Sequence, residues 1–72
     1  MANHITQGAI KVIEVIGVSK KSSDDAVAEA VKKASETVKG ISGVEVTKHM
    51  ASVKGGKIVQ YRANVKLAFV VD

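Results

Sequence analysis

The sequence predicts an α+β domain in which one helix packs on a three-stranded antiparallel sheet, with chain order β-α-β-β and strand order 1-3-2. Three features lead to this prediction. Two long segments alternate between apolar and polar residues, a glycine pair separates them, and an amphipathic segment with helical spacing precedes both. Strand, helix and strand make a crossover unit with parallel strands. The hairpin-linked third strand would lie between those two and run antiparallel to both.

The first predicted strand covers residues 10–18, which are mostly β-branched. Lys11 and Glu14 are its two charged residues, so both of its faces are largely apolar. A strand that is apolar on both faces is normally covered on both. One helix can cover one face, and we expect a neighbouring subunit to cover the other. Residues 1–8 are polar and lack periodicity, so we expect a flexible N-terminal arm followed by a domain at 9–72.

A helix is predicted after the first strand, with Ser22 or Ser23 as its cap. Asp25 lies three residues after Ser22, which approximates a capping box, and acids are favoured at a helix N-terminus. Gly40 is a stop signal at the other end. The apolar residues repeat at the spacing of one helix face, at Val27, Ala30, Val31, Ala34 and Val38.

A hairpin is predicted across residues 43–71. Every odd position from Val59 to Val71 is apolar, whereas the even positions begin polar or basic, so one face of this strand should be buried. Gly55-Gly56 fits a two-residue turn, because such turns need positive φ. A β-bulge would shift the register that this turn sets. The expected pairs are Val44–Leu67, Val46–Val65 and Met50–Tyr61 on the apolar face, and Glu45–Lys66, Thr47–Asn64 and His49–Arg62 on the polar face.

The size of the chain predicts an oligomer. A domain of 72 residues buries only about 60% of its unfolded surface, so a lone monomer would be marginally stable. The chain has no cysteine, so neither a disulfide nor a thiolate metal site can stabilise it. Hydrophobic residues make up 46% of the chain, which is enough for a core and an interface. Since small domains without covalent links often associate, we expect a homo-oligomer.

The charge balance is basic, with net charge +4, pI about 9.6 and Arg62 as the single arginine. A solvated lysine surface explains this balance better than a nucleic-acid site, because Tyr61 and Phe69 have the parity of the buried face and cannot stack on bases. No apolar run reaches the roughly 18 residues that span a membrane, and no signal peptide is visible. We therefore expect no membrane interaction and a cytoplasmic location.

No residue pattern for catalysis is present, so we do not expect an enzyme. Neither histidine lies in a nucleophile motif. Gly55-Gly56-Lys57 lacks the spacing and the hydroxyl residue of a phosphate-binding P-loop. The polar sheet face has one cluster that could form either a ligand site or a hydrogen-bonded subunit interface. Its members are Glu45, His49, Gln60, Arg62 and Lys66.

Five segments, in their order and spacing, resemble the dodecin family. They are residues 11–19, Asp25-Ala26-Val27, Glu45-Val46, residues 56–61 and residues 65–69. The resemblance implies a curved sheet that wraps the helix and twelve subunits that form a hollow cage. It also implies storage of a small ligand, with flavins (FMN, FAD or riboflavin) stacked between tryptophans at subunit contacts.

Two positions depart from the family pattern. The flavin-stacking tryptophan falls on Gly43, and the glutamine that hydrogen-bonds the flavin ring falls on Arg62. Glycine offers no flat π surface, so we expect a homododecamer in which flavin binding is weakened or lost. Glu45 and Gln60 neighbour these two positions in the candidate cofactor site. The alternative is a structural or ion-binding cage, because the resemblance also implies metal ions or anions on cage axes. No residue identifies a metal site.

Arg62 is also expected to form an ion pair. Its guanidinium carries only hydrogen-bond donors, in a planar fork that suits a carboxylate. We expect its partner to be Glu45, either in the same chain or in a neighbouring subunit. Such a salt bridge would close the flavin pocket.

Overall fold

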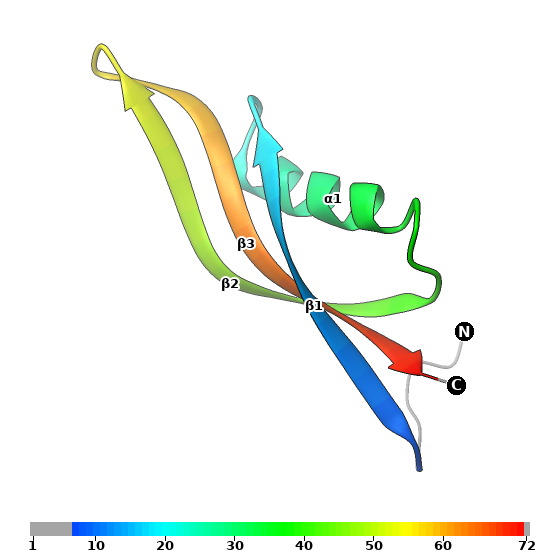
Figure 1. Ribbon diagram of the computed structural model, residues 1–72. Helices are drawn as coiled ribbons and strands as arrows, with labels where there is room; N and C mark the ends of the chain where they lie inside the picture. Colours follow the sequence, from blue (N-terminus) through cyan, green and yellow to red (C-terminus); the bar gives the residue numbers. More distant parts are fainter. Residues whose placement is uncertain (1–6, 72) are drawn as a thin grey trace.

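The structure is a computed structural model that describes residues 7–71 (Figure 1). Its elements are β1 (Ala9–Ser19), α1 (Ser23–Ala34), β2 (Ile41–Lys54) and β3 (Lys57–Val71). β3 lies between β1 and β2 and pairs antiparallel with both, which confirms the predicted fold and strand order.

The expected N-terminal arm falls largely outside the described residues. Of residues 1–8, the structure describes only Gln7 and Gly8, which are exposed. β1 begins at Ala9, the first residue of the predicted domain 9–72. The boundary between arm and domain stays a prediction.

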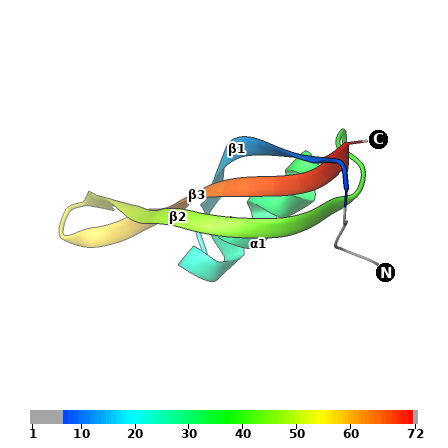
Figure 2. The same ribbon diagram turned by 90° about the horizontal axis from the view of Figure 1, so that it is seen from below.

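The helix covers one face of the sheet, and the β2–β3 hairpin extends beyond it (Figures 1 and 2). The molecule is therefore elongated, with extents of 51 × 20 × 16 Å. Gly55 and Gly56 form the predicted two-residue turn at the tip, with φ of 60° and 76°. Both values lie in the left-handed region that glycine adopts without strain. The outer part of the hairpin has no helix against it.

A network around Ser19 fixes the start of α1. The Ser19 hydroxyl is buried, donates to Asp25 Oδ2 at 2.6 Å and accepts from the Lys21 backbone N–H at 2.9 Å. Ser22 is the helix cap, and its Oγ accepts from the Asp25 N–H at 3.0 Å. Half of the predicted capping box is thus confirmed. The Asp25 carboxylate completes a different contact, because it binds Ser19.

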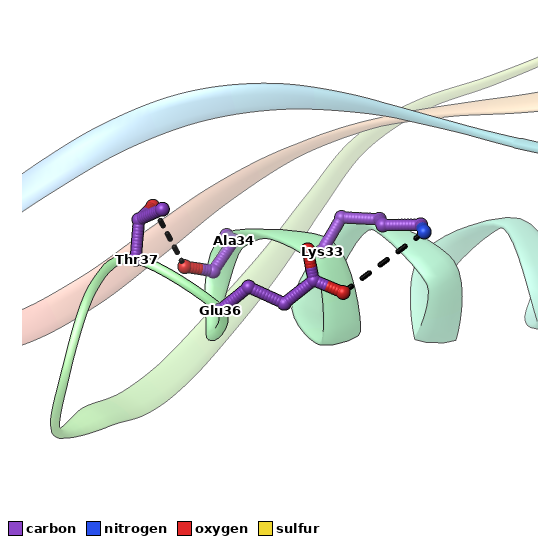
Figure 3. Close-up of polar contacts among 4 residues, drawn as sticks. All are labelled: Lys33, Ala34, Glu36 and Thr37. Carbon is purple, nitrogen blue, oxygen red and sulfur yellow. Dashed lines mark hydrogen bonds and ion pairs between the residues drawn. The ribbon is translucent and has the colours of Figure 1, made fainter.

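The helix ends at Ala34, several residues before the predicted stop at Gly40. The chain leaves through a turn in which the Thr37 hydroxyl donates to the Ala34 carbonyl oxygen at 3.5 Å (Figure 3). Serine and threonine compete for backbone hydrogen bonds in this way and disfavour further helical turns. At the same helix end, Lys33 Nζ lies 3.9 Å from Glu36 Oε2, and both side chains are exposed.

The core lies between the helix and β3, and its buried members are Ala26, Ala30, Ala63, Val65 and Leu67. Gly17 of β1 allows the helix to approach closely. A Cβ atom at Gly17 would lie 1.9 Å from the backbone oxygen of Ala26 and 2.9 Å from the Ala30 Cβ. The small, buried side chain of Ala30 contributes to this close approach.

The hairpin register agrees with the prediction only in part. The pairs Val44–Leu67, Glu45–Lys66 and Val46–Val65 are confirmed. At Thr47 an extra residue enters β2, and the Thr47 hydroxyl donates to the Asn64 backbone oxygen at 3.0 Å. Another irregularity, between Ser52 and Val53, restores the register before the turn, and a third lies between Ile41 and Gly43 at the start of β2.

The three predicted pairs beyond Val46 are therefore wrong. Asn64 pairs with Lys48, not with Thr47. Met50 lies opposite Arg62, and the partners of Tyr61 and His49 are Ala51 and Ala63. Because successive strand residues point to opposite faces, the bulge moves Lys48 and Met50 to the sheet face away from the helix.

Candidate functional site

The sheet face that the helix leaves uncovered is the candidate site, and we call it the open face. On β3 the odd-numbered Ala63, Val65 and Leu67 are buried against the helix, so the even-numbered residues point to the open face. Their partners on β1 share this face. Apart from Glu14 the β1 part is apolar, with exposed fractions of 53%, 52%, 55% and 44% for Ile10, Val12, Ile16 and Val18.

Four successive rows of side chains cross the open face, each with one residue from every strand. In the order β1, β3, β2 they are Val18–Arg62–Met50, Ile16–Asn64–Lys48, Glu14–Lys66–Glu45 and Val12–Ala68–Gly43. We name each row by its β3 residue. The β1 side is mainly apolar, whereas the Arg62, Asn64 and Lys66 rows are polar at the centre.

The predicted cofactor residues Gly43, Glu45, Gln60 and Arg62 all belong to the open face. They do not converge within one chain, because the rows of Gly43 and Arg62 are six residues apart along β3. At about 3.3 Å per residue, that separation is about 20 Å. A small ligand that contacts both positions would therefore need residues from two subunits.

Arg62 is exposed, and its Nε donates to Gln60 Oε1 at 3.0 Å. The expected ion pair with Glu45 of the same chain does not form. Glu45 lies opposite Lys66, four residues from Arg62 along the sheet, or about 13 Å. Within residues 7–71 the ion pair that forms is Lys33–Glu36. Pairing of Arg62 with Glu45 of a neighbouring subunit stays a prediction.

Gly43 has room for a larger residue. A Cβ atom there would meet only the Ala68 Cβ, at 3.6 Å, which is an ordinary contact distance. The residue also lines a hollow of about 210 Å³ between α1 and the start of β2, together with Val31, Ile41, Ser42 and Val44. The packing of the described residues thus does not require glycine at position 43.

Asn64 and Lys48 are two polar residues of the open face that the sequence did not single out. The Asn64 side-chain oxygen is buried and finds no hydrogen-bond partner among the described residues. Asparagine is disfavoured in strands, so its place in the middle of a regular alternation was an available signal. The position of Lys48 had no such signal, because it depends on the bulge.

Within the described residues, no group of three or more His, Cys, Asp or Glu side chains could hold a metal ion. The open face also has no aromatic residue, since Tyr61 and Phe69 belong to the helix-covered face. No helix in residues 7–71 has the length and apolar character needed to cross a membrane.

The dodecin family model matches residues 9–72, which is nearly the whole sequence. This chain belongs to the dodecin family. The resemblance found in the sequence is thereby confirmed, and the β-α-β-β fold of this dodecin is the fold of the solved family members.

Solved structures agree with this assignment. Dodecin from Streptomyces coelicolor matches this dodecin with a TM-score of 0.90 and 29% identity, covering 94% of this chain and 97% of that one. A calcium dodecin from Mycobacterium tuberculosis, which is calcium-chelating with a novel calcium-binding site, matches with a TM-score of 0.78 and 35% identity. The match covers 90% of this chain and 93% of that one. The tt0972 protein of Thermus thermophilus, at 18% identity, TM-score 0.86 and coverage of 92% and 97%, shares the fold. The comparison with curated proteins gave no match.

Proposed function

We propose that this dodecin assembles into a hollow homododecamer that binds and stores a small ligand and catalyses no reaction. The observation that supports this most is the open face of β1, where four β-branched side chains are about half exposed. Soluble monomers rarely expose contiguous apolar patches of large extent. Association with further copies would bury these side chains and stabilise a chain that is small for an independent domain.

Flavin is the ligand of the family, and we propose that its binding is weakened or lost in this dodecin. Gly43 offers no ring for stacking, and Arg62 offers donors only. The separation of about 20 Å between the two positions supports a site at a subunit contact, where Gly43 of one copy would approach Arg62 of another. FMN, FAD and riboflavin share the ring and would all be affected.

The alternative is a structural or ion-binding cage. The relative that chelates calcium, at 35% identity, favours it. In this chain Glu14 and Glu45 flank Lys66 on the open face, and neither forms a metal cluster within the described residues. A metal site would therefore need carboxylates from several subunits. Calorimetric titration of the assembled, chelator-treated protein with calcium tests this function. Heat of binding that depends on Glu45 would favour it over flavin storage.

The assembly is tested by native mass spectrometry. We expect a particle near twelve times the chain mass of 7.5 kDa. A monodisperse monomer or dimer at micromolar concentration would contradict the proposal. The same preparation should be colourless, since a firmly bound flavin would make it yellow.

Flavin binding should return when both departures are reversed, in the double variant Gly43→Trp with Arg62→Gln. The contact of 3.6 Å at Gly43 allows the larger residue, and an indole restores the stacking surface. We expect riboflavin fluorescence to be quenched by the double variant and not, at submicromolar concentration, by the unmodified protein. Gly43→Leu with Arg62→Gln is the matched control, because it adds bulk without a ring. Submicromolar quenching by the unmodified protein would show that flavin binding is intact.

A further inference from the structure

We propose that Arg62, Asn64 and Lys48 form a binding site for a phosphate group on the open face. The inference rests on the proposed ligand-binding function and deepens it, since it names phosphorylated small molecules as the ligand class. Asn64 and Lys48 lie directly opposite each other, about 5 Å apart, and Arg62 is two residues from Asn64 along β3, about 7 Å away. The long side chains of Arg62 and Lys48 can converge over such distances.

A hydrogen bond to Gln60, two residues along β3 on the side away from Asn64, restrains the Arg62 side chain. Its Nε is occupied by Gln60 Oε1 at 3.0 Å, which holds the plane of the guanidinium. The two terminal NH₂ groups remain as a fork, and this fork matches the oxygens of a phosphate in a bidentate arrangement. The side chain is exposed in the single chain, so the fork is left for a ligand held at the proposed subunit contact.

Asn64 adds a neutral donor between the two cations. Its Oδ1 is the buried end of the amide and has no partner among the described residues. The NH₂ end is the end that would donate to a ligand. A buried, unsatisfied acceptor lowers stability. An asparagine in mid-strand does so as well. Residues that break such local rules concentrate at functional sites, which favours a role in binding.

Lys48 reaches this position because of the β-bulge at Thr47. In the regular register Lys48 would lie opposite Ala63 and point to the helix side. The extra residue Thr47, held by its hydrogen bond of 3.0 Å to the Asn64 backbone oxygen, turns Lys48 to the open face beside Asn64. Bulges often re-aim a side chain next to a functional site.

The charge distribution on the open face favours an anion at this point. The Arg62 and Asn64 rows contain two cations and no acid, and their other members are Val18, Met50 and Ile16. The acids Glu14 and Glu45 both lie in the next row, on either side of Lys66. A phosphate near Arg62 therefore meets two positive charges and an amide donor at short range.

FMN and riboflavin form the test pair, because they share the ring and differ only in the phosphate. In competition or fluorescence titrations of the full-length protein, we expect FMN to bind at least about tenfold more tightly than riboflavin. Arg62→Gln and Lys48→Gln should each remove most of this difference. Lys57→Gln, which removes one charge at the hairpin tip, is the control and should retain it. Equal affinities for FMN and riboflavin would overturn the inference.

Inorganic phosphate gives a second readout when neither flavin binds measurably. In ¹H–¹⁵N spectra we expect phosphate to shift the Asn64 side-chain amide signals and the backbone signals of Arg62 and Lys48, and sulfate at equal ionic strength to shift them less. Uniform shifts over all lysines would overturn the site. A dodecamer without these shifts would retain the assembly and reject the phosphate site. A monomer that shows these shifts would support the phosphate site and reject the assembly.

Discussion

On the helix-covered face, small side chains meet at close range, whereas on the open face large apolar side chains stand half exposed beside charged ones. Ala26, Ala30 and Ala63 are buried within a single chain. Ile16, on the other side of the same sheet, is 55% exposed. The difference teaches that one chain completes only one face. The helix-covered face specifies the fold, and we propose that other copies and a ligand supply the contacts of the open face.

The largest effect should come from placing a charge on the open face. We expect Ile16→Asp to abolish the assembly, because an unpaired carboxylate in an apolar contact is strongly unfavourable. The single-chain fold should persist, since Ile16 is more than half exposed there. Native mass spectrometry and circular dichroism separate the two effects. Ile16→Leu keeps the apolar contact and should assemble normally. A fully assembled Ile16→Asp variant would show that β1 is not a contact surface.

A methyl group at Gly17 should disrupt the packing of the helix against the sheet. Its Cβ would lie 1.9 Å from the Ala26 backbone oxygen, so the helix must move. We expect Gly17→Ala to lower the free energy of unfolding by about 2–4 kcal/mol in urea titrations at fixed protein concentration. Gly43→Ala is the matched control, because its Cβ meets only Ala68 at 3.6 Å. Equal losses for both variants would contradict the close helix approach.

Asn64→Val should have opposite effects on the stability of the protein and on phosphate binding at the open face. Removing a buried, unpartnered amide oxygen should raise the free energy of unfolding by about 1–2 kcal/mol, while phosphate binding weakens. Chemical denaturation at one protein concentration measures the gain. Gln60→Val is the comparison, because the Gln60 oxygen already accepts from Arg62 and its removal should give no gain. A destabilised Asn64→Val protein would mean that the amide has a partner in the assembly.

The smallest effect is expected at the exposed end of the helix. Lys33 and Glu36 lie 3.9 Å apart with side chains 68% and 60% exposed, so solvent screens their attraction. We expect Glu36→Gln to change the free energy of unfolding by less than about 0.5 kcal/mol. A loss above about 1 kcal/mol in thermal or urea unfolding would show that this pair belongs to a subunit contact.

The fold could be predicted from the sequence because its signals are local. Each element has its own signal: alternation in β3, the Gly55-Gly56 turn, and the spacing of apolar residues in the helix. The order of these elements leaves one sheet topology. The bulge at Thr47 could not be predicted in the same way. Threonine fits a regular strand as well as a bulge. The choice between the two depends on sheet curvature and on the backbone contact with Asn64.

The candidate site was predicted less completely than the fold. The family resemblance identified Gly43 and Arg62, and the alternation placed them on one face. The same-chain pairing of Arg62 with Glu45 was wrong because a shared face says nothing about separation along the strand. Lys48 was missed and Met50 was misplaced for the same reason. The extra residue Thr47 reverses the sheet face of the β2 residues that follow it.

The β2–β3 pairing has three irregularities, and two of them cancel each other in register. The third lies at Ser42, between the pairs Ile41–Phe69 and Gly43–Ala68. Thr47 is the extra residue of β2, and Val59 is skipped in β3 between the pairs Ser52–Gln60 and Val53–Ile58. A chain lacking both residues would keep the register of the remaining cross-strand pairs and lose the bend that these two irregularities impose. Curvature and pairing are thus encoded separately in this hairpin. In a closed shell, the curvature of each subunit governs how many copies meet before the surface closes on itself. In the cage that we propose, Thr47 and Val59 would then help to determine the diameter.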